Sequence, residues 1–471
     1  MPLGTAMVLG FTANARAAGL FTEDRGVRPL GRGGAFVAGA DDLGAIWYNP
    51  AGLADAGTAL FIDLSWLNYS SSFARQTQVT DASGAVHTYE YPAVKGTTPF
   101  LPIPTIAGSY NFGKEKQYTL AFGVLSPYSA IASFPQTING QPAPQRYSLV
   151  SLDGSLLAIV GGYFAYKPVE QFRIGFGLQA LVGTFKTKMV LNTSPAGGVI
   201  SAPEDPSYDA LSQLSVGPII APSGNLGIIA EPDKHIRIGV SGQLPFWVNA
   251  PATIQVRLPT AAPFDNAYQR GEDARVKFKL PPVFRAGIEL RTNPKADNTL
   301  RFEVSYVREF WSMHDTIDVR SKNIQLYDIT GFPSPFGVAP ISIPRHFQDS
   351  NSYRAGLEFS TNSIFRENRI DLRVGGAYET SAIPNEWVSA LTYDANKVTI
   401  GGGGSVHLGD RWRADAVVAV ELIDDTHVDP ATAQVPLVNP VKGNPTATES
   451  INGGDYSAHA IILGVGVQYK F

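Results

Sequence analysis

The sequence predicts an all-β protein: a fourteen-stranded antiparallel transmembrane β-barrel with an N-terminal plug of short helical turns inside its lumen. Three observations predict it: segments that alternate apolar and polar residues, connections that alternate between short and long, and an N-terminal segment without strand-like alternation. The composition agrees, because charged residues make up 17% of the chain against roughly 25% in soluble domains. No stretch approaches the roughly 18 consecutive apolar residues of a membrane-spanning helix.

Alternation is clear in several segments. Residues 284–291 read Phe-Arg-Ala-Gly-Ile-Glu-Leu-Arg, and residues 353–360 read Tyr-Arg-Ala-Gly-Leu-Glu-Phe-Ser. A period of two with one apolar face is typical of a half-buried sheet. A soluble β-sandwich would show the same alternation, so this pattern alone does not distinguish the two folds.

The lengths of the connections distinguish them. Six short turns alternate with seven long connections rich in Pro and Ser, which gives fourteen strands. An even strand count with short turns at one end and long loops at the other is typical of an outer-membrane barrel. Lipid offers no hydrogen-bond partner to a sheet edge, so such a sheet has to close. The short turns lie near 113–115, 167–169, 232–234, 293–295, 365–367 and 409–410, and the long connections are 71–103, 129–146, 188–222, 250–274, 314–351, 381–395 and 426–457.

The last strand shows the expected lipid-facing stripe, because Leu463, Val465, Val467, Tyr469 and Phe471 share one face. A terminal Phe two residues after an aromatic is similar to the signal that the bacterial barrel-insertion machinery reads, so we expect that machinery as a partner through Phe471. The lipid bilayer and lipopolysaccharide are the other partners expected for the outward face. We expect a monomer in the bacterial outer membrane.

Charged residues recur on the opposite face of the predicted strands. On the lipid face each would cost about 2–4 kcal/mol near mid-membrane, whereas inside the lumen they can pair with one another or with a plug. The alternative is that they are structural scaffolding only. They are Arg285, Glu289, Arg291, Arg301, Glu303, Arg354, Glu358, Asp371 and Arg373.

The first 57 residues divide into two expected segments, followed by the barrel at 58–471. A short apolar stretch precedes Ala15-Arg16-Ala17, a small-x-small cleavage pattern, so we expect a signal peptide over residues 1–17. No Lys or Arg stands at the start, so the true start codon could lie upstream, and a buried first strand is the alternative. Residues 18–57 are rich in Gly and Ala and are expected to plug a barrel too wide to fill with its own side chains. The charges expected to meet the lumen wall are Arg25, Arg28, Arg32, Asp41 and Asp42.

Motifs within this plug resemble a known family. The runs Gly31-Arg32-Gly33-Gly34-Ala35, Ala40-Asp41-Asp42 and Asn49-Pro50-Ala51-Gly52-Leu53 are similar to the N-terminal hatch of the FadL/TodX (OMPP1) family of outer-membrane channels for long-chain fatty acids and hydrocarbons. The resemblance implies a ligand caught in an apolar groove among the outer loops and then passed to a lumen site that the mature N-terminus contacts. Binding would move the N-terminus, and the ligand would leave sideways beside a kink in the third strand.

The resemblance also implies site residues. The N-terminal contact would fall on Leu20 and Phe21, and Lys186 and Lys188 are candidates for a carboxylate head group, which needs a cation when it leaves water. The position of the family's arginine is Thr184 here, so neutral hydrocarbons remain open as ligands. The groove candidates are Leu211, Leu214, Ile219 and Ile220, for which ordinary loop packing is the alternative.

The third strand carries the candidate kink at Gly123 and Pro127. Pro removes a ladder donor and Gly weakens a strand, although Pro127 could simply end the strand at the outer loop.

We therefore expect passive uptake of hydrophobic compounds such as long-chain fatty acids, related lipids or hydrocarbons. The alternative is a general diffusion porin, plugged or open. We expect neither an enzyme nor a cofactor or metal site, because no Gly-x-Ser-x-Gly elbow precedes a helix and the seven His residues are scattered. A net charge of −4 indicates no basic surface for nucleic acid.

Overall fold

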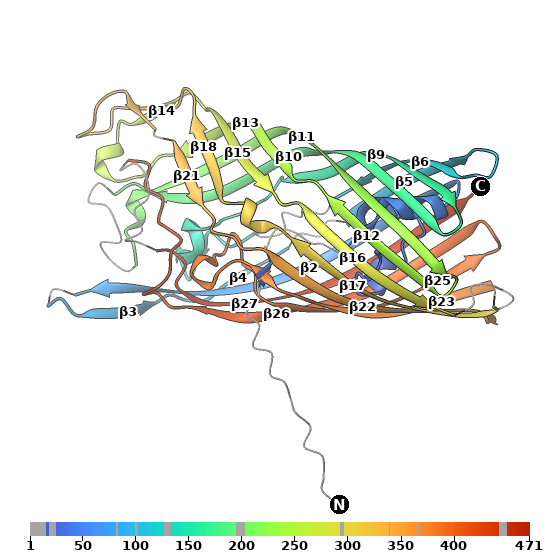
Figure 1. Cartoon of the computed structure of the whole chain (residues 1–471). Helices are drawn as coiled ribbons and strands as arrows, with labels where there is room; N and C mark the ends of the chain where they lie inside the picture. Colours follow the sequence, from blue (N-terminus) through green and yellow to red (C-terminus); the bar gives the residue numbers. More distant parts are fainter. Residues whose placement is uncertain are drawn as a thin grey trace, which may run out of the picture.

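The computed structural model describes residues 16–17, 25–81, 83–98, 102–126, 133–194, 203–292, 296–338, 340–365, 368–441 and 450–471. A closed antiparallel barrel of fourteen strands forms the body of the molecule, as the sequence predicts (Figure 1). Short turns lie at the end that carries the C-terminus, and the long connections lie at the other end. Among the described residues, no helix has the length and apolar character to cross a bilayer.

Ten of the wall strands are continuous, and four are each built from two consecutive segments. The continuous ones are β2 (Ala59–Thr80), β5 (Pro102–Phe112), β6 (Tyr118–Leu125), β9 (Leu156–Val169), β10 (Phe172–Asn192), β11 (Asp209–Asp233), β23 (Asn368–Glu379), β25 (Lys397–Leu408), β26 (Trp412–Val428) and β27 (Gly454–Lys470). The composite ones are β12 (Ile236–Gln243) with β13 (Phe246–Arg257), β15 (Asp273–Leu280) with β16 (Val283–Arg291), β17 (Asn298–Glu309) with β18 (Thr316–Ser321), and β21 (Ile341–Pro344) with β22 (Ser350–Phe365).

Shorter strands and helical turns lie in the lumen and at the end of the barrel that carries the long loops. The short strands are β1 (Arg16–Ala17), β3 (Val86–Glu90), β4 (Val94–Gly96), β7 (Thr137–Ile138), β8 (Gln141–Pro142), β14 (Tyr268–Arg270), β19 (Gln325–Tyr327), β20 (Phe336–Gly337) and β24 (Ser381–Ala382). The helical turns are α1 (Val27–Gly31), α2 (Ala45–Tyr48), η1 (Pro50–Asp55), η2 (Pro144–Tyr147), η3 (Pro206–Tyr208), η4 (Ala262–Phe264), η5 (Trp311–Met313) and η6 (Asn385–Trp387).

The outside of the wall is apolar, as a lipid-facing surface has to be. On β2, Leu60, Ile62 and Leu64 are exposed while Asp63 and Ser65 between them are buried. Aromatic rings cluster near the short turns, as in the interfacial girdles of membrane barrels. These rings include Tyr110, Phe112, Tyr118, Tyr166, Trp412, Tyr469 and Phe471.

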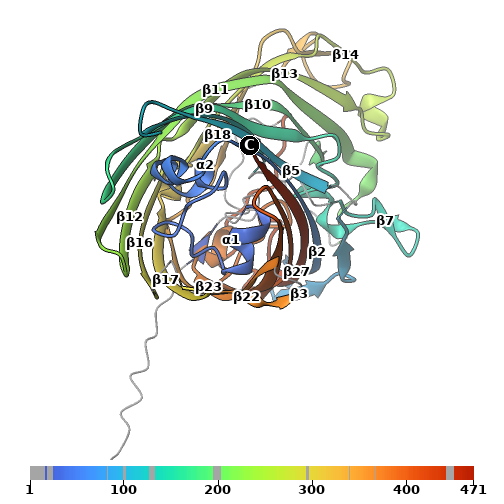
Figure 2. The same ribbon diagram turned by 90° about the vertical axis from the view of Figure 1, so that its right-hand side faces the viewer.

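The predicted plug lies inside the barrel. Figure 2 shows α1 and α2 enclosed by the ring of strands, and nearly every residue from 25 to 57 is buried. We call residues 25–57 the hatch. The first wall strand begins at Ala59, close to the predicted boundary. The expected signal peptide falls outside the described residues except for Arg16 and Ala17, which pair with β24, so its cleavage stays a prediction.

Candidate functional site

The first motif of the hatch anchors it to the wall through one buried arginine. Arg32 is fully buried, and its Nη2 lies 2.8 Å from Glu289 and 3.2 Å from Glu303. The carboxylate of Glu303 also accepts hydrogen bonds from the backbone N–H groups of Val37 (2.6 Å), Ala38 (3.0 Å) and Gly39 (2.8 Å). A carboxylate can be buried when a cation and several donors surround it, and the hatch supplies both.

Gly33 is fixed by backbone geometry and by close approach. Its φ is +60°, and a Cβ there would lie 2.2 Å from the backbone nitrogen of Gly376 on β23. Only glycine adopts this conformation without strain and lets the two chains approach so closely. Gly31 is less restricted, because a Cβ there would meet Arg373 at an ordinary 3.4 Å.

The Asn49-Pro50-Ala51 motif joins the hatch to β10 and β11. Asn49 caps η1 by accepting a hydrogen bond from the backbone N–H of Ala51, and Pro50 occupies the first position of that turn. The side-chain amide of Asn49 donates to the carbonyls of Val37 (3.0 Å) and Ile228 (3.2 Å). The motif therefore shapes the hatch and docks it onto the wall with the same side chain.

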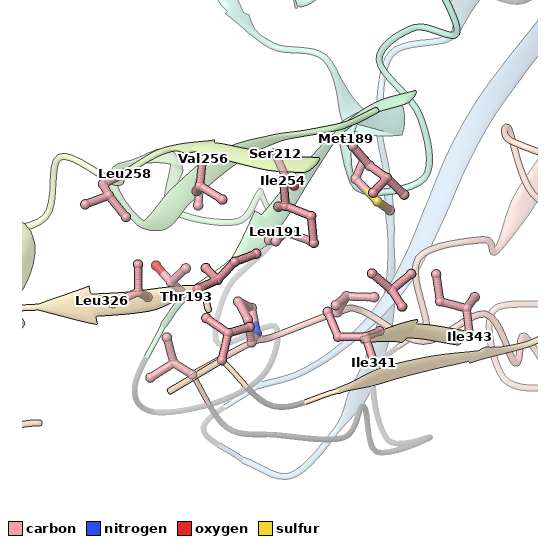
Figure 3. A pocket seen from close by; sticks show the side chains of 18 of the residues that line it. Met189, Leu191, Thr193, Ser212, Ile254, Val256, Leu258, Leu326, Ile341 and Ile343 are labelled. Atoms are coloured by element: carbon pink, nitrogen blue, oxygen red, sulfur yellow. The ribbon is translucent and has the colours of Figure 1, made fainter. Parts of the chain in front are cut away.

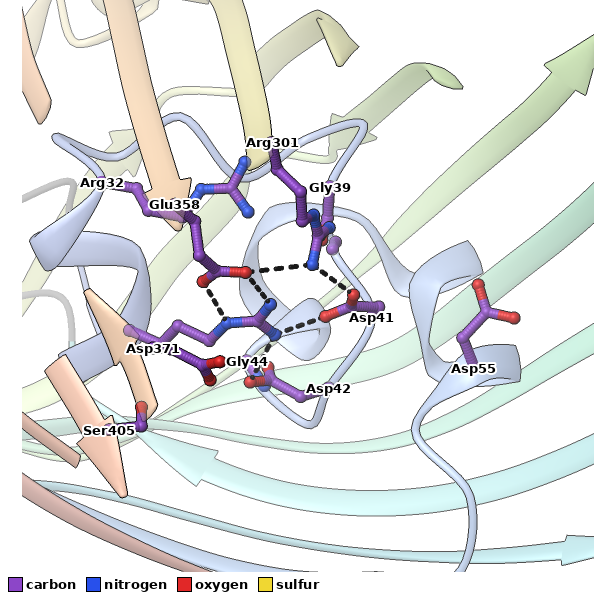
Figure 4. Close-up of polar contacts among 12 residues, drawn as sticks. Arg32, Gly39, Asp41, Asp42, Gly44, Asp55, Arg301, Glu358, Asp371 and Ser405 are labelled. Atoms are coloured by element: carbon purple, nitrogen blue, oxygen red, sulfur yellow. Dashed lines mark hydrogen bonds and ion pairs between the residues drawn. The ribbon is translucent and has the colours of Figure 1, made fainter. Parts of the chain in front are cut away.

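A second charge cluster, next to the first, ties the hatch to β17 and the adjacent strand β22. Arg28 bonds to Glu358 at 2.8 Å and also pairs with Asp41 and Asp42. Arg301 bridges Asp41 (2.7 Å) and Glu358 (3.2 Å), as Figure 4 shows. Breaking one buried pair by removing a partner typically costs about 3–5 kcal/mol. The hatch is therefore held by many such contacts, and its displacement as a whole is costly.

Further contacts extend this attachment around the wall. Asp55 pairs with Arg173 on β10 (2.7 Å) and Arg237 on β12 (3.2 Å), and Asp42 pairs with Arg413 on β26 (2.9 Å). Of the nine inward charges named from the sequence, all except Arg291 are buried. These charges are thus lumen-facing and, in several cases, bound directly to the hatch.

At the other end of the molecule an apolar pocket lies among the long loops. It encloses about 890 Å³ of unfilled space, part of it open to solvent. Thr193 and Ser212 are the polar side chains among the described lining residues, and none of the lining residues is charged. Figure 3 shows the tips of β10, β11 and β13 on one side and β19 and β21 on the other. The main apolar lining residues are Met189, Leu191, Leu214, Ile254, Val256, Leu326, Ile341 and Val438.

A buried ion pair fixes the loops near this pocket. Arg75 of β2 pairs with Glu204 in the loop between β10 and β11, and Arg146 of η2 binds Asp209 at 2.7 Å. Burial acts to raise the pKa of Glu204, but the guanidinium groups of Arg75 and Arg146 outweigh it and hold the pKa below its ordinary value. Three separate loops are thereby joined beside the pocket.

The chain matches the model of one protein family, described as outer membrane protein transport protein (OMPP1/FadL/TodX), over residues 8–471. The protein belongs to this family. Its fold is similar to the crystal structure of a Pseudomonas aeruginosa FadL homologue, with a TM-score of 0.69 at 14% identity, covering 96% of this chain and 100% of that one. No match was found among curated protein sequences.

Two solved toluene transporters show the same fold. The Pseudomonas putida transporter TodX gives a TM-score of 0.58 at 15% identity and covers 97% of this chain and 99% of that one. The Ralstonia pickettii transporter TbuX gives 0.57 at 15% identity, covering 95% and 99%. At these identities the likeness establishes the architecture, and the family match establishes membership.

The residues that the sequence suggested for ligand binding are spread over both faces of the wall in this FadL/TodX family member. Leu214 lines the pocket, and Ile219 is buried on the inward face below it. Leu211 lies on the other face, against Tyr147 and Val150, and Ile220 points outward. Ligand contact at these positions stays a prediction.

The remaining suggested residues do not line the pocket. Lys186 is exposed beside Gly154, and Lys188 shares its face of β10. Gly123 is paired on both sides, with Ala107 and Gly161, and lies against Ile46 of the hatch. Leu20, Phe21 and Pro127 lie outside the described residues, so their roles stay predictions.

The sequence did not predict several of the pocket residues, because strands extend into segments that were expected to be loops. β13 continues to Arg257, inside the predicted connection 250–274, and β10 continues to Asn192, inside 188–222. The alternation of Ile254, Val256 and Leu258 with polar residues was the available signal. Val438, in the loop before β27, and Ile341, at the start of β21, come from segments distant in the chain, and no local pattern predicted their contribution.

Proposed function

We propose that this protein is a passive channel of the bacterial outer membrane that takes up neutral hydrophobic molecules, with aromatic hydrocarbons as the best-fitting class. The observation that carries the proposal is the pocket at the outer end, whose described lining carries no charge. An ionised carboxylate placed there would lose its water without gaining a cation, which is costly. The toluene transporters TodX and TbuX, which share the fold, support the same class of ligand.

The path that we propose begins at the pocket and does not run straight through the barrel. A hydrophobic molecule would be captured among the loops, pass into the lumen above the hatch and leave sideways into the bilayer. The ion pairs at Arg28, Arg32 and Asp55 support this route, because displacing the whole hatch would break all of them in one step. Movement limited to the N-terminal residues around Leu20 and Phe21 remains part of the proposal. No catalytic step is involved.

A charge introduced into the pocket tests the proposal. Ile254 lines the pocket, and its neighbour Gln255 is exposed on the opposite face of β13. We expect Ile254→Lys to lose most toluene binding and uptake in reconstituted vesicles and to gain binding of benzoate, since the ammonium group can then pair with a carboxylate. Gln255→Lys adds the same charge one residue away and should behave like the unmodified protein.

Two results would contradict this function. One is tight benzoate binding by the unmodified protein with little toluene uptake, which would point to an acid transporter. The other is a large, steady ion current through the unmodified protein in a planar bilayer, which would indicate a diffusion porin whose lumen is open to water.

A further inference from the structure

Three ladder pairs in the described part of the barrel wall join two side chains of like charge, counting carboxylates, lysines and arginines. Side chains at such positions lie about 5 Å apart at Cβ, and like charges there destabilise a sheet. A counter-ion therefore stabilises each of these pairs. The three pairs are Glu289–Glu303, Arg291–Arg301 and Arg275–Arg320.

The protein itself supplies the counter-ions of two pairs. Arg32 of the hatch lies 2.8 and 3.2 Å from the two carboxylates of the glutamate pair. In the Arg291–Arg301 pair, Glu231 binds the first guanidinium group and Asp41 binds the second at 2.7 Å. The wall thus tolerates like charges side by side where the fold brings an opposite charge to them.

The third pair has no counter-ion among the residues that the structure describes. The guanidinium group of Arg275 on β15 donates to Asn249, at 3.0 Å to the side-chain oxygen and at 3.3 Å to the backbone carbonyl. The side chain of Arg320 on β18 has neither an ion pair nor a hydrogen bond within the same residues. Asp273 is two residues from Arg275, but it is bonded to Asn323 at 2.8 Å and pairs with neither arginine.

Both arginines of this pair lie on the outward face of the wall. Ala274 and Val276 flank Arg275, and Val319 precedes Arg320; all three of these neighbours are buried on the inward side. Successive side chains of a strand point to opposite faces, so the two guanidinium groups point away from the lumen. Their strands β15 and β18 lie side by side near the long loops, next to β13 (Figure 1).

Two lysines extend this outward row along β15. Lys277 and Lys279 are exposed on the same face as Arg275. Asp315 pairs with Lys279 at 3.4 Å, and Asp318 stands opposite Lys277 in the ladder with β18. Neither carboxylate pairs with an arginine of the third pair in the described ranges, so the positive charge of that pair is retained. We call this surface the basic patch, and its residues are Arg275, Lys277, Lys279 and Arg320.

The basic patch begins where the apolar outer surface of the same wall strand ends. The outward residues of β16, which continues β15 toward the short turns, include Phe284, Ile288 and Leu290. Lys279 lies eleven residues from Leu290, which at about 3.3 Å per residue and a tilt of about 40° is roughly 28 Å of height. The apolar band of such barrels is about 25 Å tall. The patch therefore lies just beyond the hydrocarbon, on the side of the long outer loops.

A tryptophan marks the same level independently. Trp247 on β13 is 66% exposed and stands opposite Lys279 in the ladder. Trp side chains are enriched where hydrocarbon meets the polar head groups, and lysine side chains reach from that level toward water. The Trp247–Lys279 pair thus lies at the outer interface, and the arginine pair lies at the level of the lipid head groups.

We propose that the basic patch binds the phosphate groups of one lipopolysaccharide molecule of the outer leaflet, with the Arg275–Arg320 pair at the centre of the site. The inference rests on the outer-membrane location in the proposed function and adds a lipid partner to it. A guanidinium group binds phosphate oxygens through parallel, charge-assisted hydrogen bonds, and two of them on adjacent strands can reach the same phosphate. The acyl chains of that molecule then cover the apolar surface of β16 below the patch.

This site has a signature in heat stability that a purely structural role of the arginines would not produce. In lipid-free detergent, Arg275→Gln/Arg320→Gln removes a repulsion between like charges, so the variant should melt at or above the temperature of the unmodified protein. A ligand that binds the folded state raises its stability. Added lipopolysaccharide should therefore raise the melting temperature of the unmodified protein by more than that of the variant.

Lipid binding by the delipidated, full-length protein in a nonionic detergent tests the proposal. Native mass spectrometry measures the bound lipid, and thermal melting measures the stabilisation. The probe is purified lipopolysaccharide that carries the phosphates of its lipid A but lacks the outer sugars. The comparison arms are the same lipid after removal of its phosphates, phosphatidylglycerol, and inorganic phosphate. The patch variant is Arg275→Gln/Arg320→Gln, and the control is Lys114→Gln/Arg411→Gln, which removes two exposed basic residues at the short turns.

We expect the dissociation constant for lipopolysaccharide to rise by roughly thirtyfold in the patch variant, since each basic residue near an anionic lipid surface contributes a factor of about five. The control should bind like the unmodified protein. Removal of the phosphates should weaken binding to the unmodified protein and change little in the patch variant. The arm with the dephosphorylated lipid needs only the unmodified protein, so it decides the question even if the variant fails to fold.

Four results would overturn the basic patch as a lipopolysaccharide site: equal affinity of the patch variant and the unmodified protein, an equal loss in the control, unchanged binding after removal of the phosphates, or equal stabilisation by phosphatidylglycerol or inorganic phosphate. Toluene uptake into phospholipid vesicles is measured separately. Absence of uptake by the unmodified protein, with lipopolysaccharide binding intact, would overturn the proposed transport and leave the lipid site standing.

Discussion

Removal of the Arg32 guanidinium should loosen the hatch. In Arg32→Met, the carboxylate of Glu303 would remain buried without its guanidinium partner, whereas Glu289 would keep Arg301 at 3.0 Å. Stranding a buried charge in this way costs about 3–5 kcal/mol. Since about 1.4 kcal/mol corresponds to a tenfold change in an equilibrium, the population with a displaced hatch should rise by roughly two to four orders of magnitude.

Single-channel recording measures this population, because a displaced hatch leaves an aqueous path through the barrel. We expect frequent open events in Arg32→Met and few in the unmodified protein. Arg320→Met removes an arginine that is exposed on β18 and should leave the record unchanged. The double variant Arg32→Met/Glu303→Gln should be quieter than Arg32→Met alone, because it removes the carboxylate that loses its guanidinium partner. A silent Arg32→Met channel with undiminished heat stability would refute the reasoning.

Two further predictions concern the hatch and the loops. Gly33→Ala should also raise channel activity, since its Cβ would collide with the backbone of Gly376. Gly31→Ala is the matched control, because its Cβ would make ordinary contacts. Equal single-channel activity in the two variants would contradict the packing argument. The Glu204 pair with Arg75 should hold the loops at neutral pH, because the pKa of Glu204 in the folded protein lies below its ordinary value. That contribution is present above the ordinary pKa and is lost as the pH falls through the lowered one. Backbone hydrogen exchange of residues 203–209 should therefore accelerate in acid, beyond the change in the intrinsic exchange rate. In Glu204→Gln the same residues should exchange rapidly at neutral pH. If their protection in the unmodified protein does not depend on pH, the Glu204–Arg75 pair does not hold the loops.

The sequence was informative wherever the physical signal is local. Alternation with a period of two and the sorting of connections by length predicted the closed barrel, since both follow from a strand that faces lipid on one side and a polar lumen on the other. The inward position of Glu289, Arg301 and Glu358 followed from the same alternation. Arg32, Gly33 and Asn49 were singled out through the resemblance of their motifs to the hatch of the family.

The sequence was misleading where a bulge changes the face of a strand. Leu211 and Leu214 point to opposite sides by ordinary strand alternation, as do Ile219 and Ile220. The register shift near Gly217 places Ile219, and not Ile220, on the inward side with Leu214. A shift of one residue moves every following side chain to the other face. No local pattern in the segment reveals where that shift occurs.

By itself, the sequence determined the class of fold, because that depends on short-range periodicity, and its N-terminal segment without strand-like alternation indicated a plug. Tertiary structure alone decided where the apolar pocket lies. The pocket unites side chains from loops far apart in the chain, such as Leu214 and Val438. The register shift between β10 and β11 near Gly183 exists only after those two strands are placed side by side.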